Sequence, residues 1–398
     1  MSGRHVILCL TSYFKGNRFL ARAKQEGCKV ILMTVEGMLH EPWDRDHIDE
    51  VFALKSFSDV RHVINAIGYL YRTRPIDRLV ALDDYDVELA AHLREHFRLP
   101  GMGDSTIRYF RDKLAMRYRA RELGIHIPEF VPAFNHEDVK SFLKTVPAPW
   151  LVKPRSEASA IGIKKLANEK DVFADLERRG DDQCNCLIEE MIPGDLYHVD
   201  SIVHQGKVRF TQVSRYFRPL LDVYHGGGVF MSQTLPDHAP EVAPLQAMNA
   251  KLLGGFGMDC CASHTEFMKA HADGNFYFIE TSARVGGANI SEMIEAARGL
   301  NLWEEWAKVE IDRDRSYELP PLRNEHGGVI VSLIKTEKPN DGDFADPEIW
   351  YRMNKKSHVG LVLRSPSANR VEDLLRQYEA KINKDYLAVL PAASKATA

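Results

Sequence analysis

Two glutamates in this sequence are placed as a pair of metal ligands on one face of a sheet. Glu266 and Glu280 lie in two strand-like segments that flank an Asp-Gly turn signal ending at Gly274. A three-residue loop over 272–274, with Gly274 in the left-handed conformation, puts Glu266 directly across from Glu280. Because side chains alternate between the faces of a strand, Ser282 shares their face.

Opposed carboxylates repel each other unless a cation neutralises them. Magnesium takes one or two carboxylates together with phosphate oxygens, which is the ligand set that this hairpin presents. The alternative is a solvated face on which two opposed glutamates are tolerated. The metal interpretation depends on the register, because a slip of one residue sends the two side chains to opposite faces.

A cation and two glycines follow the second glutamate. Arg284 supplies a planar, bidentate charge, while Gly286 and Gly287 allow backbone to approach a ligand closely. We expect Arg284 beside a phosphate in transfer and the two glycines near the substrate. The alternative for Arg284 is a simple ion pair with Glu280.

Two lysines upstream have the compact charge that suits phosphate oxygens. Lys113 lies in a charged segment that predicts one helix over 106–124, and Lys153 ends the apolar strand 150–153. A single lysine is most often a surface residue. Lys153 is the less ordinary of the two, because a charge on an apolar strand needs a partner.

A loop over 156–162, rich in small and hydroxyl residues, follows Lys153 and includes Ser156 and Ser159. It matches neither the P-loop nor the dinucleotide-binding pattern. The next strand and turn, 187–194, combine an apolar run with two acids and offer an edge for an adenine base.

Residues 214–228 lie between the strand 187–192 and the hairpin, where they are placed to close over a bound substrate. Arg215 and His225 are therefore candidate substrate contacts. For His225 an ordinary loop histidine is an equal alternative.

The elements predict three structural units. Residues 1–104 alternate short β-branched strands with amphipathic helices, which indicates a parallel α/β domain. Residues 105–190 form a central unit that includes a small lid, and 191–390 form a strand-rich carboxy-terminal unit. We expect the small-residue tail 391–398 to be disordered.

Composition sets limits on the class of protein. The 398 residues carry a net charge of −4, so no basic field is present to collect nucleic acid or anionic lipid. The apolar run Val6–Leu10 is too short for a signal peptide or a membrane span, which predicts a cytoplasmic protein. The six cysteines lack zinc-site spacing and are expected to be reduced thiols.

These motifs, in this order, resemble the ATP-grasp superfamily, especially its biotin-carboxylase-like carboxylate–amine ligases that include L-amino-acid ligases. The resemblance covers roughly residues 5 to 310 and is most specific at 264–267 and 278–287. It implies a mixed α/β and α+β fold: a Rossmann-like amino-terminal domain, a small lid and a carboxy-terminal ATP-grasp domain.

The resemblance also implies the roles of individual residues. Lys113 and Lys153 would hold the phosphates of ATP beneath the 156–162 loop, and Arg284 would stabilise the reaction. The metal ligands would be Glu266, Glu280 and Ser282, binding Mg²⁺, expected as two ions, with Mn²⁺ as a substitute. Contacts to adenine and ribose would come from Glu189, Glu190, Met191, Ile192 and Asp195.

Two positions depart from the family pattern. Ser282 stands where the family has a metal-binding asparagine, and Leu196 stands where many relatives have a ribose-binding glutamate. The two glutamates and the arginine remain, so we expect an active enzyme. The expected reaction joins a small-molecule carboxylic acid to an amine, with amino acids as the favoured substrates.

Three alternatives stay open: a biotin-carboxylase-like enzyme that activates bicarbonate, an ATP-grasp kinase, and a nucleotide-binding regulatory module. Relatives often pair through the amino-terminal region, which makes a homodimer an expectation.

Overall fold

The computed structural model describes residues 5–158, 160–219, 221, 223 and 227–389. Ser159, His225 and the predicted tail 391–398 lie outside the described residues. Among the described residues, no helix is long and apolar enough to cross a membrane.

The first domain is a parallel sheet with the strand order β3-β2-β1-β4, as the alternating pattern predicts. All six residues of β1 are buried, because a parallel sheet is covered on both faces. The strands are β1 (Val6–Thr11), β2 (Lys29–Val35), β3 (Glu50–Leu54) and β4 (Arg78–Ala81). The connecting helices are α1 (Asn17–Gln25), α2 (Val60–Tyr71) and α3 (Val87–Phe97).

The single helix predicted over 106–124 is wrong, because the chain breaks it into α4 (Asp104–Ile107) and α5 (Lys113–Glu122). Asp112 begins the second helix, since its side chain accepts hydrogen bonds from the backbone N–H groups of Leu114 and Ala115. The break places Lys113 in the first turn of α5.

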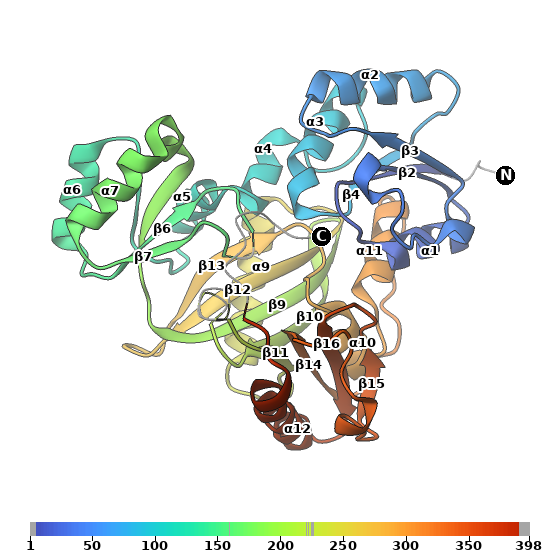
Figure 1. The fold of residues 1–398 in the computed structure, drawn as a ribbon. Coiled ribbons are helices and arrows are strands. Elements are labelled where there is room, and N and C mark those ends of the chain that lie inside the picture. The colour runs from blue at the N-terminus through green and yellow to red at the C-terminus, as the bar shows by residue number, and fades with distance from the viewer. Residues whose placement is uncertain (1–4, 159, 220, 222, 224–226, 390–398) are drawn as a thin grey trace.

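A four-stranded antiparallel sheet follows, with α6 and α7 together on one of its sides, well away from the first domain (Figure 1). Its order is β5-β8-β6-β7. The strands are β5 (Phe130–Pro132), β6 (Trp150–Pro154), β7 (Lys164–Leu166) and β8 (Cys186–Glu190), and the helices are α6 (His136–Thr145) and α7 (Glu169–Arg179).

The largest sheet has eight strands in the order β13-β12-β9-β10-β11-β14-β16-β15. Its strands are β9 (Gly194–His204), β10 (Lys207–Tyr216), β11 (Phe230–Thr234), β12 (Cys261–Ala270), β13 (Phe276–Ser282), β14 (His326–Leu333), β15 (Ile349–Arg352) and β16 (His358–Ser365). The helices of this part of the chain are α9 (Val242–Phe256), α10 (Ile290–Arg298), α11 (Leu302–Ile311) and α12 (Ala368–Lys381).

The β12–β13 hairpin pairs Glu266 with Glu280, as predicted, although the predicted loop is wrong. Ala270 and Asn275 pair around a four-residue loop, in which Gly274 has the expected positive φ of 72°. A β-bulge between Phe278 and Glu280 leaves Ile279 unpaired and restores the register at the two glutamates.

The loop between β4 and α3 contains a buried acid with an altered pKa. Burial, with Asp83 nearby, raises the pKa of Asp86 to about 7, against the hydrogen bonds that Ser12 donates to it. The protein is therefore destabilised as the pH rises from the ordinary pKa of this carboxyl, 3.8, to its raised pKa in the folded state, because the buried group then has to ionise.

We therefore expect Asp86→Asn to raise the urea denaturation midpoint at pH 8 and to lose this advantage as the pH falls toward 4. The amide oxygen of Asn still accepts from Ser12, so the charge is the main change. Glu88→Gln, at an exposed residue in the first turn of α3, is the control. Equal midpoints of Asp86→Asn and the wild type at every pH would contradict the expectation.

Candidate active site

A cavity of about 400 Å³ lies between the four-stranded and the eight-stranded sheets. Its lining combines charged and polar groups with apolar side chains. The polar lining consists of Lys113, Lys153, Glu190, Tyr216, His264, Glu266, Glu280 and Arg284.

Glu280 carries its charge in this cavity. Its carboxylate lies 3.0 Å from Nζ of Lys113, which also donates to the backbone oxygen of Glu157 at 2.6 Å. Burial alone would raise the pKa of Glu280, but Lys113, with Lys153 and Arg284, lowers it to about 2. The carboxylate is therefore ionised and available to a cation throughout the neutral range.

Glu266 lies across from Glu280 and is 6% exposed. The hydroxyl of Tyr216 donates to its Oε1 at 3.0 Å, and Nε2 of His264 lies 3.5 Å from the same atom. Burial alone would lower the pKa of His264, but Asp200 and Glu266 raise it to about 9. Two opposed carboxylates, each with a cationic neighbour, are a suitable donor set for a hard divalent ion.

Lys153 is held from behind by a buried acid. Its Nζ lies 2.5 Å from Glu189, whose other oxygen accepts from Nε of Arg117 at 2.5 Å. Arg117 and Glu189 are fully buried. Burial alone would raise the pKa of Glu189, but the two cations lower it, so this carboxylate orients Lys153 and does not line the cavity.

Arg284 is backed by the first domain. Asp84, in the loop after β4, lies 3.8 Å from its Nη2 and 3.7 Å from Nη1 of Arg111. All three side chains are buried or nearly so. The amino-terminal domain therefore supplies the countercharge that aims Arg284 at the cavity.

The apolar lining of the cavity comes from both sheets and from the segments that adjoin them. One group lies in or next to β6, β7, β8, β9, β12 and β13, and includes Leu151, Ile163, Met191, Ile192, Leu196, Met268 and Ile279. A second group comes from the chain after β10, the start of β11 and the start of α10, namely Pro219, Leu221, Val223, Phe230, Ala288 and Ile290.

Several predicted site residues do not line the cavity. The strands alternate, so Tyr216 faces it while Arg215 pairs with Glu372 at 2.5 Å. Leu196 likewise lines it, whereas the exposed Asp195 lies 3.5 Å from His271. The same alternation separates Glu190, in the cavity, from Glu189. Ser156 is half-buried outside it.

Ser282 and Gly286 lie behind the lining. The Ser282 hydroxyl donates to the backbone oxygen of His264 at 3.5 Å, so metal binding would require it to leave that partner. A Cβ at Gly286 would lie 3.0 Å from both Asp200 Oδ1 and His264 Nδ1, so this glycine packs on polar side chains beneath the site. Gly287 lines the cavity.

Sequence reasoning gave no role to Tyr216, His264 or Asp84. His264 and Tyr216 stood in segments already singled out, and strand alternation from Glu266 and from β10 was the signal that could have placed them. Asp84 carried no such signal, because only the packing of the first domain brings it to Arg284.

The chain belongs to the ATP-grasp family. The family model described as the ATP-grasp N-terminal domain matches residues 20–101, and the model of the ATP-grasp domain matches residues 110–288. The second range contains both lysines, both glutamates and Arg284.

Two of the proteins that this chain resembles are L-amino acid ligases. The chain is 24% identical over 344 residues to an L-arginine-specific L-amino acid ligase of Bacillus subtilis, an alignment that covers 84% of this chain and 81% of the relative. The fold matches a crystal structure of an L-amino acid ligase from Bacillus licheniformis with a TM-score of 0.76 and 16% identity, over 97% and 99% of the chains.

A second structure with this fold is N5-carboxyaminoimidazole ribonucleotide synthetase from Thermus thermophilus. It aligns with a TM-score of 0.73 and 15% identity over 96% of this chain and 99% of that one. The fold predicted from the motifs is confirmed.

The packing of Gly286 can be tested by stability. We expect Gly286→Ala to lower the free energy of unfolding by roughly 1–3 kcal/mol, because the new methyl group overpacks buried Asp200 and His264. The denaturation midpoint should fall accordingly. Gly287→Ala is a matched control, since a Cβ there meets no atom within 4 Å. Equal midpoints for the two variants would contradict this placement of Gly286.

Proposed function

We propose that this protein is an ATP-dependent ligase that joins the carboxylate of one small molecule to the amine of another through an acyl phosphate. The observation that carries the proposal is the opposed pair Glu266 and Glu280, which line the cavity together with Lys113 and Arg284. The matches to ATP-grasp models and to amino acid ligases support it.

The chemistry follows from the charges that line the cavity. A substrate carboxylate oxygen attacks the γ-phosphorus of ATP, and the bond from that phosphorus to the β–γ bridging oxygen breaks, which releases ADP. Negative charge spreads over the transferring group, and Lys113, Lys153 and Arg284 stabilise it as preorganised cations. The product is a mixed carboxylic–phosphoric anhydride.

The amine completes the reaction. Its nitrogen attacks the carbonyl carbon, the carbon–oxygen bond to phosphate breaks, and the nitrogen loses a proton as the amide forms. Water would hydrolyse the anhydride, so the small sheet with its 155–163 loop has to exclude water during both steps. Lys113 already contacts this loop through Glu157.

Glu266 and Glu280 would hold Mg²⁺, which supplies Lewis-acid charge stabilisation to the phosphates when bound. Two ions, and Mn²⁺ as a substitute, belong to this proposal. The apolar lining residues Leu151, Met191 and Ile192 would suit adenine, and the part of the lining that includes Arg284 would suit the acid and the amine. The favoured substrates are amino acids, and a homodimer through the first domain is part of the same proposal.

The activity can be tested with magnesium ATP and a matrix of amino acids, other small carboxylic acids and amines, with ADP and free phosphate both measured. We expect release of both products only when an acid and an amine are present together, with an amide as the new compound. Glu280→Gln should lower turnover roughly 100-fold or more, because a metal ligand is lost.

Other outcomes of this assay point elsewhere. ADP without free phosphate would indicate a kinase, and turnover that needs bicarbonate and biotin would indicate a carboxylase. ATP binding without turnover on any mixture would contradict the ligase proposal and favour a regulatory module.

Arg284→Lys should lower kcat roughly 10²- to 10³-fold with a smaller change in the KM for ATP. A lysine keeps the charge but loses the planar donor pair that is aimed at the transferring group. Arg376→Lys, at an exposed side chain of α12, is the control and should leave both constants unchanged. Equal losses in kcat and in ATP affinity would instead assign Arg284 to ground-state binding.

A further inference from the structure

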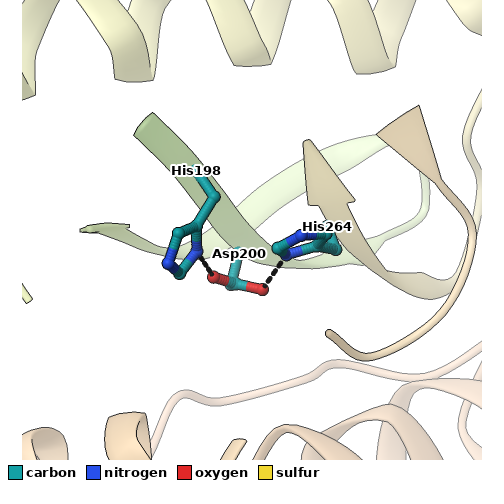
Figure 2. Close-up of side chains that lie close together, drawn as sticks. All are labelled: His198, Asp200 and His264. Carbon is teal, nitrogen blue, oxygen red and sulfur yellow. Dashed lines mark hydrogen bonds and ion pairs between the residues drawn. The ribbon is translucent and has the colours of Figure 1, made fainter. Parts of the chain in front are cut away.

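A group of buried polar side chains, His198, Asp200 and His264, lies next to Glu266 on the same face of the large sheet. Figure 2 shows the three side chains. His198 and Asp200 belong to β9, and His264 belongs to β12. The register pairs His198 with Glu266 and Asp200 with His264, so all four side chains stand together. His198 and Asp200 are fully buried, and His264 is 8% exposed.

One carboxylate joins the two imidazole rings. Nδ1 of His198 lies 2.6 Å from Oδ2 of Asp200, and Nδ1 of His264 lies 2.8 Å from Oδ1 (Figure 2). Each Nδ1–H donates to its own oxygen of Asp200. Both rings are therefore fixed in orientation by a single acid.

The outer nitrogens extend this group in two directions. Nε2 of His198 lies 2.6 Å from Oγ of Ser232, whose hydroxyl donates to the backbone oxygen of Arg215. Nε2 of His264 lies 3.2 Å from the hydroxyl of Tyr216, which donates to Oε1 of Glu266. A continuous chain of hydrogen bonds thus runs from Ser232 to a proposed metal ligand.

These residues support the site and are not themselves a second metal centre. Their ligand atoms lie within 4.8 Å of one another, close enough for an ion. However, all four ring nitrogens and both oxygens of Asp200 already have protein partners. A metal would have to displace the hydrogen bonds that hold the rings.

We propose that His198, Asp200 and His264 are positioning residues that fix Glu266 for metal binding, an inference that rests on the proposed function. Tyr216 donates its hydrogen bond to Oε1 of Glu266. The network of hydrogen bonds therefore holds this carboxylate in one orientation and leaves Oε2 for the metal. Gly286 packs directly on Asp200 and His264, so the loop that carries Arg284 is built on the same support.

The test is a titration of the full-length protein with Mn²⁺ in the presence of ADP. Electron paramagnetic resonance measures the concentration of free Mn²⁺ at each point and so gives the Kd. Asp200→Asn should raise the Kd for Mn²⁺ roughly 10- to 100-fold, because partners behind a metal ligand typically have this effect. The amide nitrogen of Asn cannot accept from a histidine N–H, so one ring loses its anchor.

Ser201→Ala is the matched control. Ser201 is the next residue of β9, faces the other side of the sheet, and accepts from Nδ2 of Asn249 at 2.9 Å, with both residues fully buried. The variant therefore breaks a buried hydrogen bond of the same strand and leaves intact the network of hydrogen bonds that leads to Glu266. Its Mn²⁺ affinity should equal that of the wild type, and an equal loss in both variants would overturn the inference.

His264→Asn provides a second, milder variant. Its amide can still donate to Asp200 from the position of Nδ1, but it is too short to reach Tyr216. We expect weaker Mn²⁺ binding with a thermal midpoint close to that of the wild type. A wild-type Kd for this variant would overturn the positioning role.

Glu266→Gln separates this inference from the proposed function. If it binds Mn²⁺ as tightly as the wild type, Glu266 is not a metal ligand and the proposed site fails together with the inference. If it loses Mn²⁺ while Asp200→Asn and His264→Asn keep the wild-type Kd, only the inference fails. Loss in all three variants, but not in Ser201→Ala, supports both.

Discussion

The structure around the cavity is organised by one electrostatic constraint, the repulsion between two carboxylates that face each other on neighbouring strands. Glu266 and Glu280 lie on the same sheet face, where water alone does not screen them, so cations and donors have to surround them. Lys113 comes from α5, Arg284 from the loop after β13, and Tyr216 from β10. Distant parts of the chain therefore meet at this pair, because their cations and hydrogen-bond donors compensate the charge of the two carboxylates.

The cations at this point are themselves held by buried acids. Glu189 of the small sheet pairs with both Lys153 and Arg117 of α5, and Asp84 of the first domain lies behind Arg284. Charges fixed in this way need little reorganisation when a phosphoryl group is transferred, which is the usual source of electrostatic catalysis. The proposed chain from Asp200 to Glu266 extends this principle from the cations to a metal ligand.

The hairpin shows how a prediction from sequence can reach the right pairing through an incomplete argument. The turn signal at Gly274 indicated a three-residue loop, whereas the chain forms a four-residue loop and a bulge at Ile279 that cancel in register. Bulges have weak sequence signals because they depend on how neighbouring strands twist and pack. Strand alternation was the stronger rule, and it explains why Tyr216 and Leu196 face the cavity where Arg215 and Asp195 had been expected.

By itself, the sequence determined the fold family, the parallel first domain and the chemical types at the site, since periodicity, turns and short motifs are local properties of the chain. It could not determine which acid lies behind which cation. Asp84 and Arg284 are 200 positions apart, and Arg117 and Glu189 become partners only when α5 packs on the small sheet. Tertiary structure decided these pairings, because a buried charge pairs with the opposite charge that lies nearest in the folded structure, whatever their separation in the sequence.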